Sequence, residues 1–239
     1  MDMGAEGHWF RYTFTFPDGT ERKFSVTLDE TYRIANVERE SWPEWTQLDK
    51  NKCPNCPLDS KTVPRCPVAE HLVDVIDFFK NALSVEVVDV KIEVPARTYV
   101  RKQVPLSQGV SGLIGIIMPT SGCPILGRLK PMVGTHLPFA SLQETAYRML
   151  SMYLMGQYFR MRRGSEPDWE FKELIELFDG IRIVNKSFCK RLHLVCEQDA
   201  SLNAVVRLDC FADNSSFLIQ RKGLDKIEGT FDEFFKKNA

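Results

Sequence analysis

The sequence predicts an α+β fold, with an N-terminal antiparallel β-hairpin lobe followed by a mostly helical body. Residues 10–28 alternate apolar and polar side chains on both sides of a Pro-Asp-Gly turn, which is the period of β-strands. Beyond residue 105, apolar side chains instead recur at helical spacing over long stretches. We expect a β-rich lobe over 1–104 that carries the cysteine segment 53–66, and a helical body over 105–239. The two should form one compact unit.

The charge balance excludes some classes of partner. The 239 residues include 31 basic and 32 acidic side chains, a net charge of −1 at pH 7. This balance gives no global electrostatic reason to bind nucleic acid or an anionic membrane surface. The N-terminus shows no secretory signal, and the most apolar window, LIGIIM at 113–118, is too short to span a bilayer. We therefore expect a cytoplasmic protein without a nucleic-acid or membrane partner.

The hairpin is predicted from two alternating runs around PDGT, residues 17–20. Successive side chains of a strand point to opposite faces, so the apolar members should share and bury one face. These members are Phe10, Tyr12, Phe14, Phe16, Phe24, Val26 and Leu28. Residues 40–65 should be irregular, because prolines interrupt them repeatedly.

The next elements are a helix and two extended segments. A helix should begin after Cys66, since Pro67 suits a first helical turn and apolar residues then recur at helical spacing as far as Leu83. Residues 85–94 alternate as a strand does, and 97–104 form a further extended segment. The segment SQGVSGLIGIIM (107–118) fits a helix with glycines on one face. Each helical glycine costs roughly 1 kcal/mol against alanine, so close packing should compensate.

The remaining sequence predicts further helices. Ser141-Leu-Gln-Glu144 is a capping box that opens a helix over about 142–162. That helix is apolar around much of its circumference, which is typical of burial in a core or at an interface. Other helices are expected over 167–179 with a stop at Asp179-Gly180, and then over 181–195, 200–211 and 231–235.

Four cysteines form the strongest candidate site. The stretch KCPNCPLDSKTVPRCPVAEH (52–71) holds three cysteines, each followed by proline, and a fourth Cys-Pro pair lies at 123–124. Cys-x2-Cys lets one turn present two thiolates to one metal. Cys66 precedes a predicted helix whose positive end should lower the pKa of its thiol. We therefore predict that Cys53, Cys56, Cys66 and Cys123 meet in space as metal ligands.

Two metal centres fit these ligands. A zinc site of four cysteines usually combines two Cys-x2-Cys turns, whereas three clustered cysteines with a remote Cys-Pro are closer to iron–sulfur ligation. Pro57, directly after Cys56, has no N–H to donate to sulfur. The pattern favours a [4Fe-4S] cluster over Zn2+. Both stay open, with His71 as an alternative ligand.

Other interpretations of the cysteines are weaker. Seven is an odd number, which argues against a disulfide framework in a reducing compartment. A redox pair would normally open a helix after a strand, and Pro57 and Asp59 do not fit a helix start. Packing as small apolar side chains suits Cys189, Cys196 and Cys210, which lie on or near predicted helix faces.

A second group of candidates follows Cys123. Arg128, Lys130 and His136 lie in the Gly/Pro-punctuated segment 126–139. Loops of this kind often carry function, and cations near a metal site can bind an anionic ligand or offset thiolate charge. The alternative is a solvated loop whose basic side chains pair with neighbouring acids. No dinucleotide fingerprint, Walker loop, zincin motif or nucleophile elbow occurs in the sequence.

Parts of the chain resemble an uncharacterised family of bacterial proteins. The residues that carry the resemblance are SGLIGIIMPTSGCP and LKPMVGTHLPFASLQETAYRMLSMYLMGQYF within 111–159, together with CPNCPL upstream and the opening FRYTFTFPDGT. The resemblance covers most of the chain. It implies a soluble bacterial protein that bears cysteines, and it transfers no activity.

These observations predict a metal-binding protein of regulatory, signalling or redox-sensing type. It would act through a protein partner or through self-association of the apolar helix 142–162. The competing prediction is a metalloenzyme, with an iron–sulfur or zinc centre beside the 123–136 loop and Arg128, Lys130 and His136 lining a pocket. A closed site is typical of a structural metal, whereas an enzyme needs an open position or an adjacent cavity.

Overall fold

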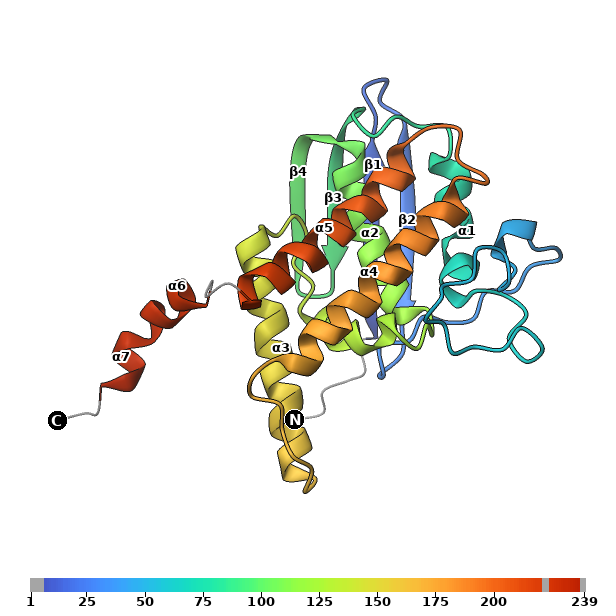
Figure 1. The fold of residues 1–239 in the computed structure, drawn as a ribbon. Coiled ribbons are helices and arrows are strands. Elements are labelled where there is room, and N and C mark those ends of the chain that lie inside the picture. The colour runs from blue at the N-terminus through green and yellow to red at the C-terminus, as the bar shows by residue number, and fades with distance from the viewer. Residues whose placement is uncertain (1–6, 221–223, 237–239) are drawn as a thin grey trace.

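A computed structural model describes residues 7–220 and 224–236, with the side chains of 214–220 and 226 left undescribed. The first six residues, which belong to the N-terminal segment without a predicted secretory signal, lie outside the described part. Figure 1 shows a sheet at the back of the molecule with helices in front of it. The fold is α+β, as the sequence predicts.

The sheet contains four antiparallel strands in the order β2-β1-β3-β4. Their bounds are β1 His8–Thr15, β2 Glu21–Leu28, β3 Val87–Val94 and β4 Arg97–Pro105. The predicted hairpin is confirmed, with Thr15 paired to Glu21 and Gly19 at a φ of 85° in the turn. The strand β3 then pairs with the free side of β1, so the two hairpins join into one sheet.

The alternation of the hairpin buries one face of the sheet. Phe10, Tyr12 and Phe14 of β1 are buried, as are the three alternating apolar residues of β2. The ring of Phe14 lies 5.2 Å from that of Phe79, edge to face. This arrangement adds to the stability that simple burial provides. The predicted aromatic face of the sheet therefore forms one side of the hydrophobic core.

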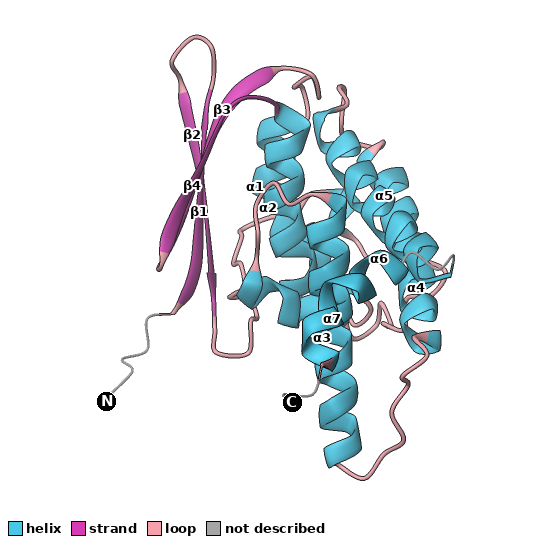
Figure 2. Ribbon diagram, turned by 90° about the vertical axis from the view of Figure 1, so that its left-hand side faces the viewer, coloured by secondary structure: helices cyan, strands magenta, loops and turns pink. Residues whose placement is uncertain are grey.

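All the long helices cover this one face (Figure 2). The inner layer is α1 Pro67–Phe79 and α2 Leu106–Thr120, and the outer helices are α3 Leu142–Arg162, α4 Lys172–Leu192 and α5 Ala200–Gln220. Two short helices, α6 Asp225–Glu228 and α7 Asp232–Phe235, lead away from the body. Short 3-10 segments occur at η1 Glu44–Thr46, η2 Leu126–Thr135 and η3 Gly229–Phe231.

The glycine face of α2 packs closely, as predicted. A Cβ at Gly109 would lie 2.7 Å from the ring of Phe14 and 2.8 Å from the side chain of Val90. A Cβ at Gly112 would lie 3.1 Å from the hydroxyl of Tyr12. The absence of side chains therefore lets α2 sit directly on the sheet, which compensates for the low helix propensity of glycine.

Helix α3 confirms the predicted bounds, and only part of its apolar surface is buried within the chain. The side chain of Ser141 accepts from the N–H of Glu144, and the Glu144 carboxylate accepts from the Ser141 N–H, which completes the capping box. The lower half of the helix projects beyond the body (Figure 1). Its apolar side chains are largely exposed there: Leu154, Met155, Tyr158, Phe159 and Met161. We call these five residues the α3 patch.

Helix α4 corrects a predicted helix end. It begins at Lys172, after Phe171 in a left-handed conformation, and it continues through Gly180 to Leu192. A single glycine weakens a helix without breaking it when the flanking turns are packed. Here Leu177, Ile181 and Val184 are buried on either side of Gly180. Packing therefore overrides the local stop signal.

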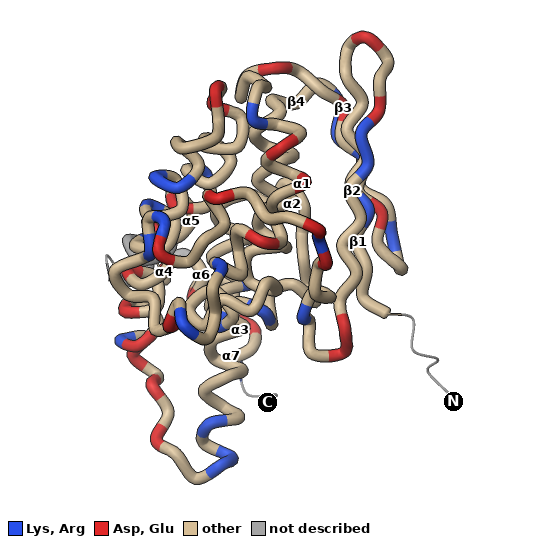
Figure 3. The backbone as a smooth tube through the Cα atoms, turned by 90° about the vertical axis from the view of Figure 1, so that its right-hand side faces the viewer, with Lys and Arg blue, Asp and Glu red and all other residues tan. Residues whose placement is uncertain are grey.

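Charges are spread over the fold. The backbone tube in Figure 3 shows Lys and Arg interspersed with Asp and Glu along most elements. No single basic face is visible in that view, in line with the net charge of −1. Among the helices of the described residues, none combines the length and apolarity needed to cross a membrane.

Candidate functional site

The cysteine segment is held by a short ladder of backbone hydrogen bonds. Leu48 donates its N–H to the carbonyl of Pro64 at 2.9 Å, and Cys66 donates to Thr46 at 2.8 Å. These bonds bring the two ends of the loop together just before α1. Within the loop, the N–H of Cys56 donates to the carbonyl of Cys53 at 2.9 Å, which closes the Cys-x2-Cys turn. Three cysteines are thereby fixed near the first turn of α1.

The fourth cysteine comes from the turn after α2. Gly122 has a φ of 96°, in the left-handed region that favours glycine, so the chain can reverse directly before Cys123. The carbonyl of Cys123 then accepts from the N–H of Gly127 at 2.8 Å. The left-handed turn therefore accounts for the glycine directly before Cys123.

The structure brings the four cysteines to one small cavity. Cys53, Cys56, Cys66 and Cys123 all line it, and α4 closes it from the other side with Val184, Phe188 and Arg191. We call this the cysteine pocket. Its volume is only about 20 Å³, and all four cysteines are partly buried. Residues 53–66 and 123, far apart in the chain, therefore share one site.

The thiols are not arranged around a single point. Within the described residues, no three His, Cys, Asp or Glu side chains form a group that could hold a metal ion as they stand. One zinc ion would need its sulfurs about 3.8 Å apart, as follows from tetrahedral bonds of about 2.3 Å. His71 does not line the pocket. Its ring nitrogens lie 2.8 Å and 3.3 Å from the carbonyl oxygens of Pro67 and Ala35.

Burial dominates the chemistry of these thiols. Burial is the largest cause that raises the pKa of the Cys53 thiol to about 11. Burial also raises the pKa of Cys66, although Arg191 and the N–H groups of Val68 and Ala69 act in the opposite direction. The start of α1 thus acts on the pKa of Cys66 in the expected direction, but desolvation outweighs it and the pKa is raised overall.

Cys123 follows the same pattern as Cys66. Burial raises the pKa of its thiol, while hydrogen bonds from the backbone of Leu126 and Ile125 lower it. The sulfurs of Cys66 and Cys123 thus each accept hydrogen bonds from the backbone N–H groups two and three residues later in the sequence. Such donors favour the thiolate form that binds metals.

Arg191 is the residue that sequence reasoning missed. Its side chain is only 2% exposed, and it is the largest fully buried side chain of the described residues. The guanidinium donates to the carbonyls of Trp45 at 2.5 Å, Gln47 at 2.6 Å and Leu48 at 3.1 Å. Among the described residues it forms no ion pair with a carboxylate. A basic residue in the last turn of a helix is common, so the sequence carries no signal for this role.

The second group of predicted site residues does not lie together in the structure. This group is Arg128, Lys130 and His136. Arg128 and Lys130 lie in η2 and line neither the cysteine pocket nor the other cavity described below. Lys130 instead lies near the Asp29 carboxylate. The pKa of Asp29 is lowered mainly by hydrogen bonds from Arg33 and Thr31, and the charge of Lys130 makes a smaller contribution. His136 alone faces a cavity, and its Nε2 lies 2.9 Å from the hydroxyl of Tyr12.

A family model described as a domain of unknown function (DUF6901) matches residues 10–232. The chain belongs to this family. The match spans both the sheet and the helices, and it includes all four cysteines of the pocket. No curated protein matches the chain, and no solved structure matches it.

This DUF6901 domain contains a second and larger cavity of about 190 Å³. It lies between α2, η2, α3, α4 and α5, and we call it the helix cavity. Leu126, Met149, Phe178 and Leu208 contribute to its apolar wall. One sequence signal was available: Asn185 is a polar residue four positions after Ile181 on the apolar face of α4. A buried polar side chain at such a place often marks a site.

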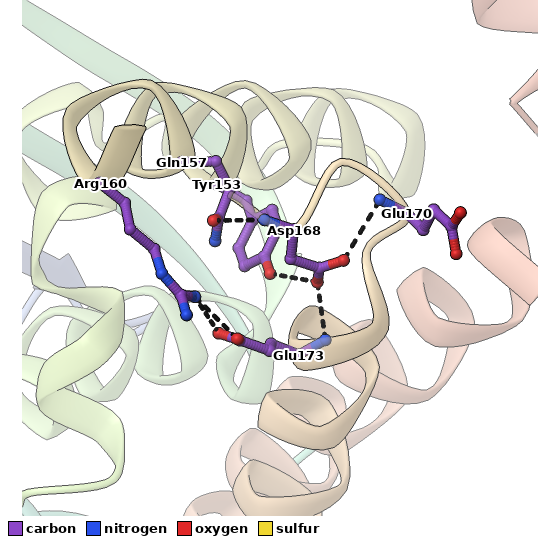
Figure 4. Close-up of polar contacts among 6 residues, drawn as sticks. All are labelled: Tyr153, Gln157, Arg160, Asp168, Glu170 and Glu173. Atoms are coloured by element: carbon purple, nitrogen blue, oxygen red, sulfur yellow. Dashed lines mark hydrogen bonds and ion pairs between the residues drawn. The ribbon is translucent and has the colours of Figure 1, made fainter. Parts of the chain in front are cut away.

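A polar cluster of the DUF6901 domain joins α3 to the start of α4 (Figure 4). The Asp168 carboxylate accepts from the hydroxyl of Tyr153 at 2.6 Å and from the N–H of Glu173 at 2.8 Å. Arg160 donates to both oxygens of Glu173 at 2.7 Å. Burial raises the pKa of Asp168, but these hydrogen bonds outweigh it and lower the pKa overall. Every group here is paired, so the cluster serves to position α4.

The other cysteines differ from the packing prediction in one case. Cys189 and Cys196 are partly buried and pack against the core, as expected. Burial raises the pKa of each thiol to about 11. Cys210, in α5, is exposed. Its interpretation as a core residue is therefore wrong.

Proposed function

We propose that Cys53, Cys56, Cys66 and Cys123 bind an inorganic metal centre, a [4Fe-4S] cluster in preference to Zn2+. We further propose that this centre makes the protein a redox-sensing regulator or signalling protein of the bacterial cytoplasm. The observation that carries the proposal is the buried positive charge of Arg191 beside four thiols. The family resemblance supports the bacterial origin.

A buried charge without a counter-charge is costly. Removing an ion from water costs several kcal/mol even after the protein relaxes, and pairing normally offsets this cost. Three carbonyl oxygens accept from Arg191. Burial lowers the pKa of Arg191, and the only groups among the described residues that raise it are the thiols of Cys66, Cys53 and Cys56. A metal that displaces thiol protons would turn these groups into thiolates. Arg191 would then balance part of the negative charge of the centre.

The arrangement of the sulfurs supports a cluster over one zinc ion. Each thiolate of a four-iron cluster binds a separate iron, so its sulfurs stand farther apart than around one Zn2+. The four cysteines line one cavity, and within the described residues no three of them form a group that could hold a single metal ion as it stands. Such a centre would also tie two distant chain segments together, and its binding energy would add to folding.

The position of the cysteine pocket and the exposed part of α3 support the proposal of a regulatory role. The prolines after three of the cysteines are exposed: Pro54, Pro57 and Pro124. The centre would therefore lie near the surface, where oxidants have access. The α3 patch offers an apolar surface for a second copy of the chain or for a protein partner.

The experiment is purification of the full chain without oxygen, followed by measurement of iron, acid-labile sulfide, zinc and visible absorption. A cluster gives a brown protein with about four iron and four sulfide per chain. Zinc at about one per chain without colour would replace the cluster by the zinc alternative. Neither metal would contradict the whole proposal.

Matched variants test the ligands. Cys123→Ser and Cys53→Ser should each lose most of the bound metal. Cys196→Ser is the control, because Cys196 is also partly buried but does not line the cysteine pocket. Equal metal content in Cys123→Ser and Cys196→Ser would show that the metal lies elsewhere.

A metalloenzyme is the second candidate, and the helix cavity favours it. Ile125 and Val184 line the cysteine pocket. The residues that follow them directly, Leu126 and Asn185, line the helix cavity. The two cavities are therefore lined by neighbouring residues of the same segments. An enzyme would place its substrate in the helix cavity, with His136 in the wall. Turnover that requires both Cys123 and His136 would establish this candidate.

A further inference from the structure

The helix cavity has room for a small molecule. Its volume is about 190 Å³. An engineered apolar cavity of about 150 Å³ is large enough to bind benzene, so an aromatic ring with one substituent has a comparable size. The volume is below the range of about 300–1,000 Å³ that drug-sized ligands occupy. The occupant should therefore be small.

Three residues of the wall carry an unpaired N–H group. They are Arg148 through Nε, Asn185 through Nδ2 and Arg207 through Nε. Asn185 is only 2% exposed, so its amide cannot turn to bulk water. A buried donor without a partner costs about 1–3 kcal/mol. All three groups are donors, so a ligand that satisfies them must bring acceptor oxygens.

The charge of the wall is positive. Arg148 and Arg207 line the cavity, and no Asp or Glu does so among the described residues. Arg148 donates through Nη2 to the carbonyl of Met132 at 2.9 Å. Burial lowers the pKa of Arg148, while Tyr99 and Glu144, neither of which lines the cavity, raise it. Burial lowers the pKa of His136 to about 3, so this ring adds no charge at neutral pH. The wall therefore favours an anion over a neutral molecule.

We propose that the helix cavity binds a small organic carboxylate with an apolar body, held by Arg148, Asn185 and Arg207. The two carboxylate oxygens would accept from the unpaired N–H groups, and the body would contact side chains such as Met149, Phe178 and Leu208. A phosphate monoester fits less well, because its additional oxygens and charge would face apolar walls. The site does not depend on the metal proposal, since none of these residues lines the cysteine pocket.

The experiment uses the full chain as isolated and observes 4-fluorobenzoate by fluorine NMR. We expect saturable binding with a dissociation constant below about 1 mM, a modest affinity for a ligand of this size. The neutral analogue 4-fluorobenzyl alcohol should bind about tenfold more weakly or worse, because it lacks the charge and one acceptor oxygen. Competition between hexanoate and 4-fluorobenzoate distinguishes two kinds of natural ligand. Strong competition by hexanoate indicates an aliphatic acid, and weak competition indicates an aromatic acid.

Variants locate the binding site. Arg207→Met should weaken 4-fluorobenzoate binding about tenfold, and Asn185→Leu should weaken it as well. Arg207 makes no hydrogen bond or ion pair with another described residue, so Arg207→Met should fold normally. The control is Arg162→Met, which removes an exposed arginine in the last turn of α3. Circular dichroism spectra of all variants check the fold.

Three results would overturn the proposal. The first is no saturable binding of either acid by the wild-type chain up to about 10 mM. The second is equal affinity for the alcohol and the acid. The third is unchanged binding in folded Arg207→Met and Asn185→Leu. The first two need only the wild-type chain, so they decide the matter even if a variant does not fold.

Discussion

The Nη1 atom of Arg191 lies 2.5 Å from the carbonyl oxygen of Trp45, although the two residues are 146 positions apart in the chain. The same guanidinium reaches the carbonyls of Gln47 and Leu48. A single side chain of α4 thus holds the segment whose Thr46 carbonyl accepts from the N–H of Cys66. The position of the cysteine pocket depends on this contact.

Arg191→Leu should destabilise the fold strongly. It leaves three carbonyl groups without their donor, so we expect a loss of about 3 kcal/mol or more in the free energy of unfolding by urea. Arg191→Lys should lose less, because it keeps one charge but cannot reach all three carbonyls. Lys190→Leu is the control, since it removes an exposed charge from the same turn. A loss below about 1 kcal/mol in Arg191→Leu would contradict the role of Arg191.

Metal removal should lower the stability of the wild-type chain if the proposed centre is present. A metal that binds only the folded chain adds its binding energy to the free energy of unfolding. The midpoint of thermal unfolding should therefore fall after treatment with a chelator and a reductant. Cys123→Ser should already show the lower midpoint and respond little to the same treatment. Cys196→Ser should respond as the wild type does.

His136 should make stability depend on pH in a window below neutrality. Burial lowers the pKa of His136 in the folded state to about 3, whereas an unfolded histidine has a pKa of about 6.5. The unfolded state therefore binds more protons between these values, so the folded state loses stability as the pH falls below about 6.5. The loss can reach about 1.4 kcal/mol per pH unit. Urea unfolding at pH 7, 6 and 5 measures it.

His136→Gln tests the source of this slope, because glutamine does not titrate and can still accept a hydrogen bond from Tyr12. The slope between pH 7 and 5 should become smaller. His193→Gln, which changes an exposed histidine, should keep the wild-type slope. Equal slopes in all three proteins would exclude His136 as the cause.

Two glycine-to-alanine variants should change stability in opposite directions. Gly109→Ala inserts a Cβ 2.7 Å from Phe14 and 2.8 Å from Val90, so we expect a destabilisation of about 1–3 kcal/mol from overpacking. Gly156→Ala in α3 meets nothing within 4 Å and should stabilise by up to about 1 kcal/mol through helix propensity. Chemical denaturation measures both. A stabilised Gly109→Ala would show that α2 and the sheet can separate at no cost.

The α3 patch should make the chain self-associate if the proposed contact is between copies. Met155 is 60% exposed within this patch. Analytical ultracentrifugation should show an average mass that rises with concentration, and Met155→Glu should raise the dissociation constant about tenfold or more, since it places a charge in an apolar contact. Leu194→Glu alters an exposed apolar residue outside the patch and should have no effect. A wild-type chain that stays monomeric would leave only a different protein as the partner.

Local signals predicted most of the fold. The alternation of Phe10, Tyr12 and Phe14 indicated the hairpin, and the Ser141–Glu144 capping box indicated the start of α3, because both depend on neighbours in the sequence. The predicted stop at Gly180 failed, since tertiary packing decided the outcome. Element type could thus be predicted more reliably than the ends of elements.

The residues of the candidate sites also differ in how well the sequence predicts them. The cysteines share a visible Cys-Pro motif, so the sequence alone is enough to group them. Arg191 and Asn185 have no motif, and their roles arise from contacts with distant segments. Arg128 and Lys130 show the reverse case. They lie close to Cys123 in sequence, but η2 directs this segment along another path.

The contact of α4 with the cysteine pocket also has a consequence for biosynthesis. All four cysteines leave the ribosome before Val184, Phe188 and Arg191 exist, because translation proceeds from the N-terminus. The nascent chain therefore presents an open half-site, without its lid or its counter-charge, until α4 has emerged and docked. Closure of the pocket is coupled to completion of most of the polypeptide, so a truncated chain that ends before α4 retains the thiols but cannot shield them.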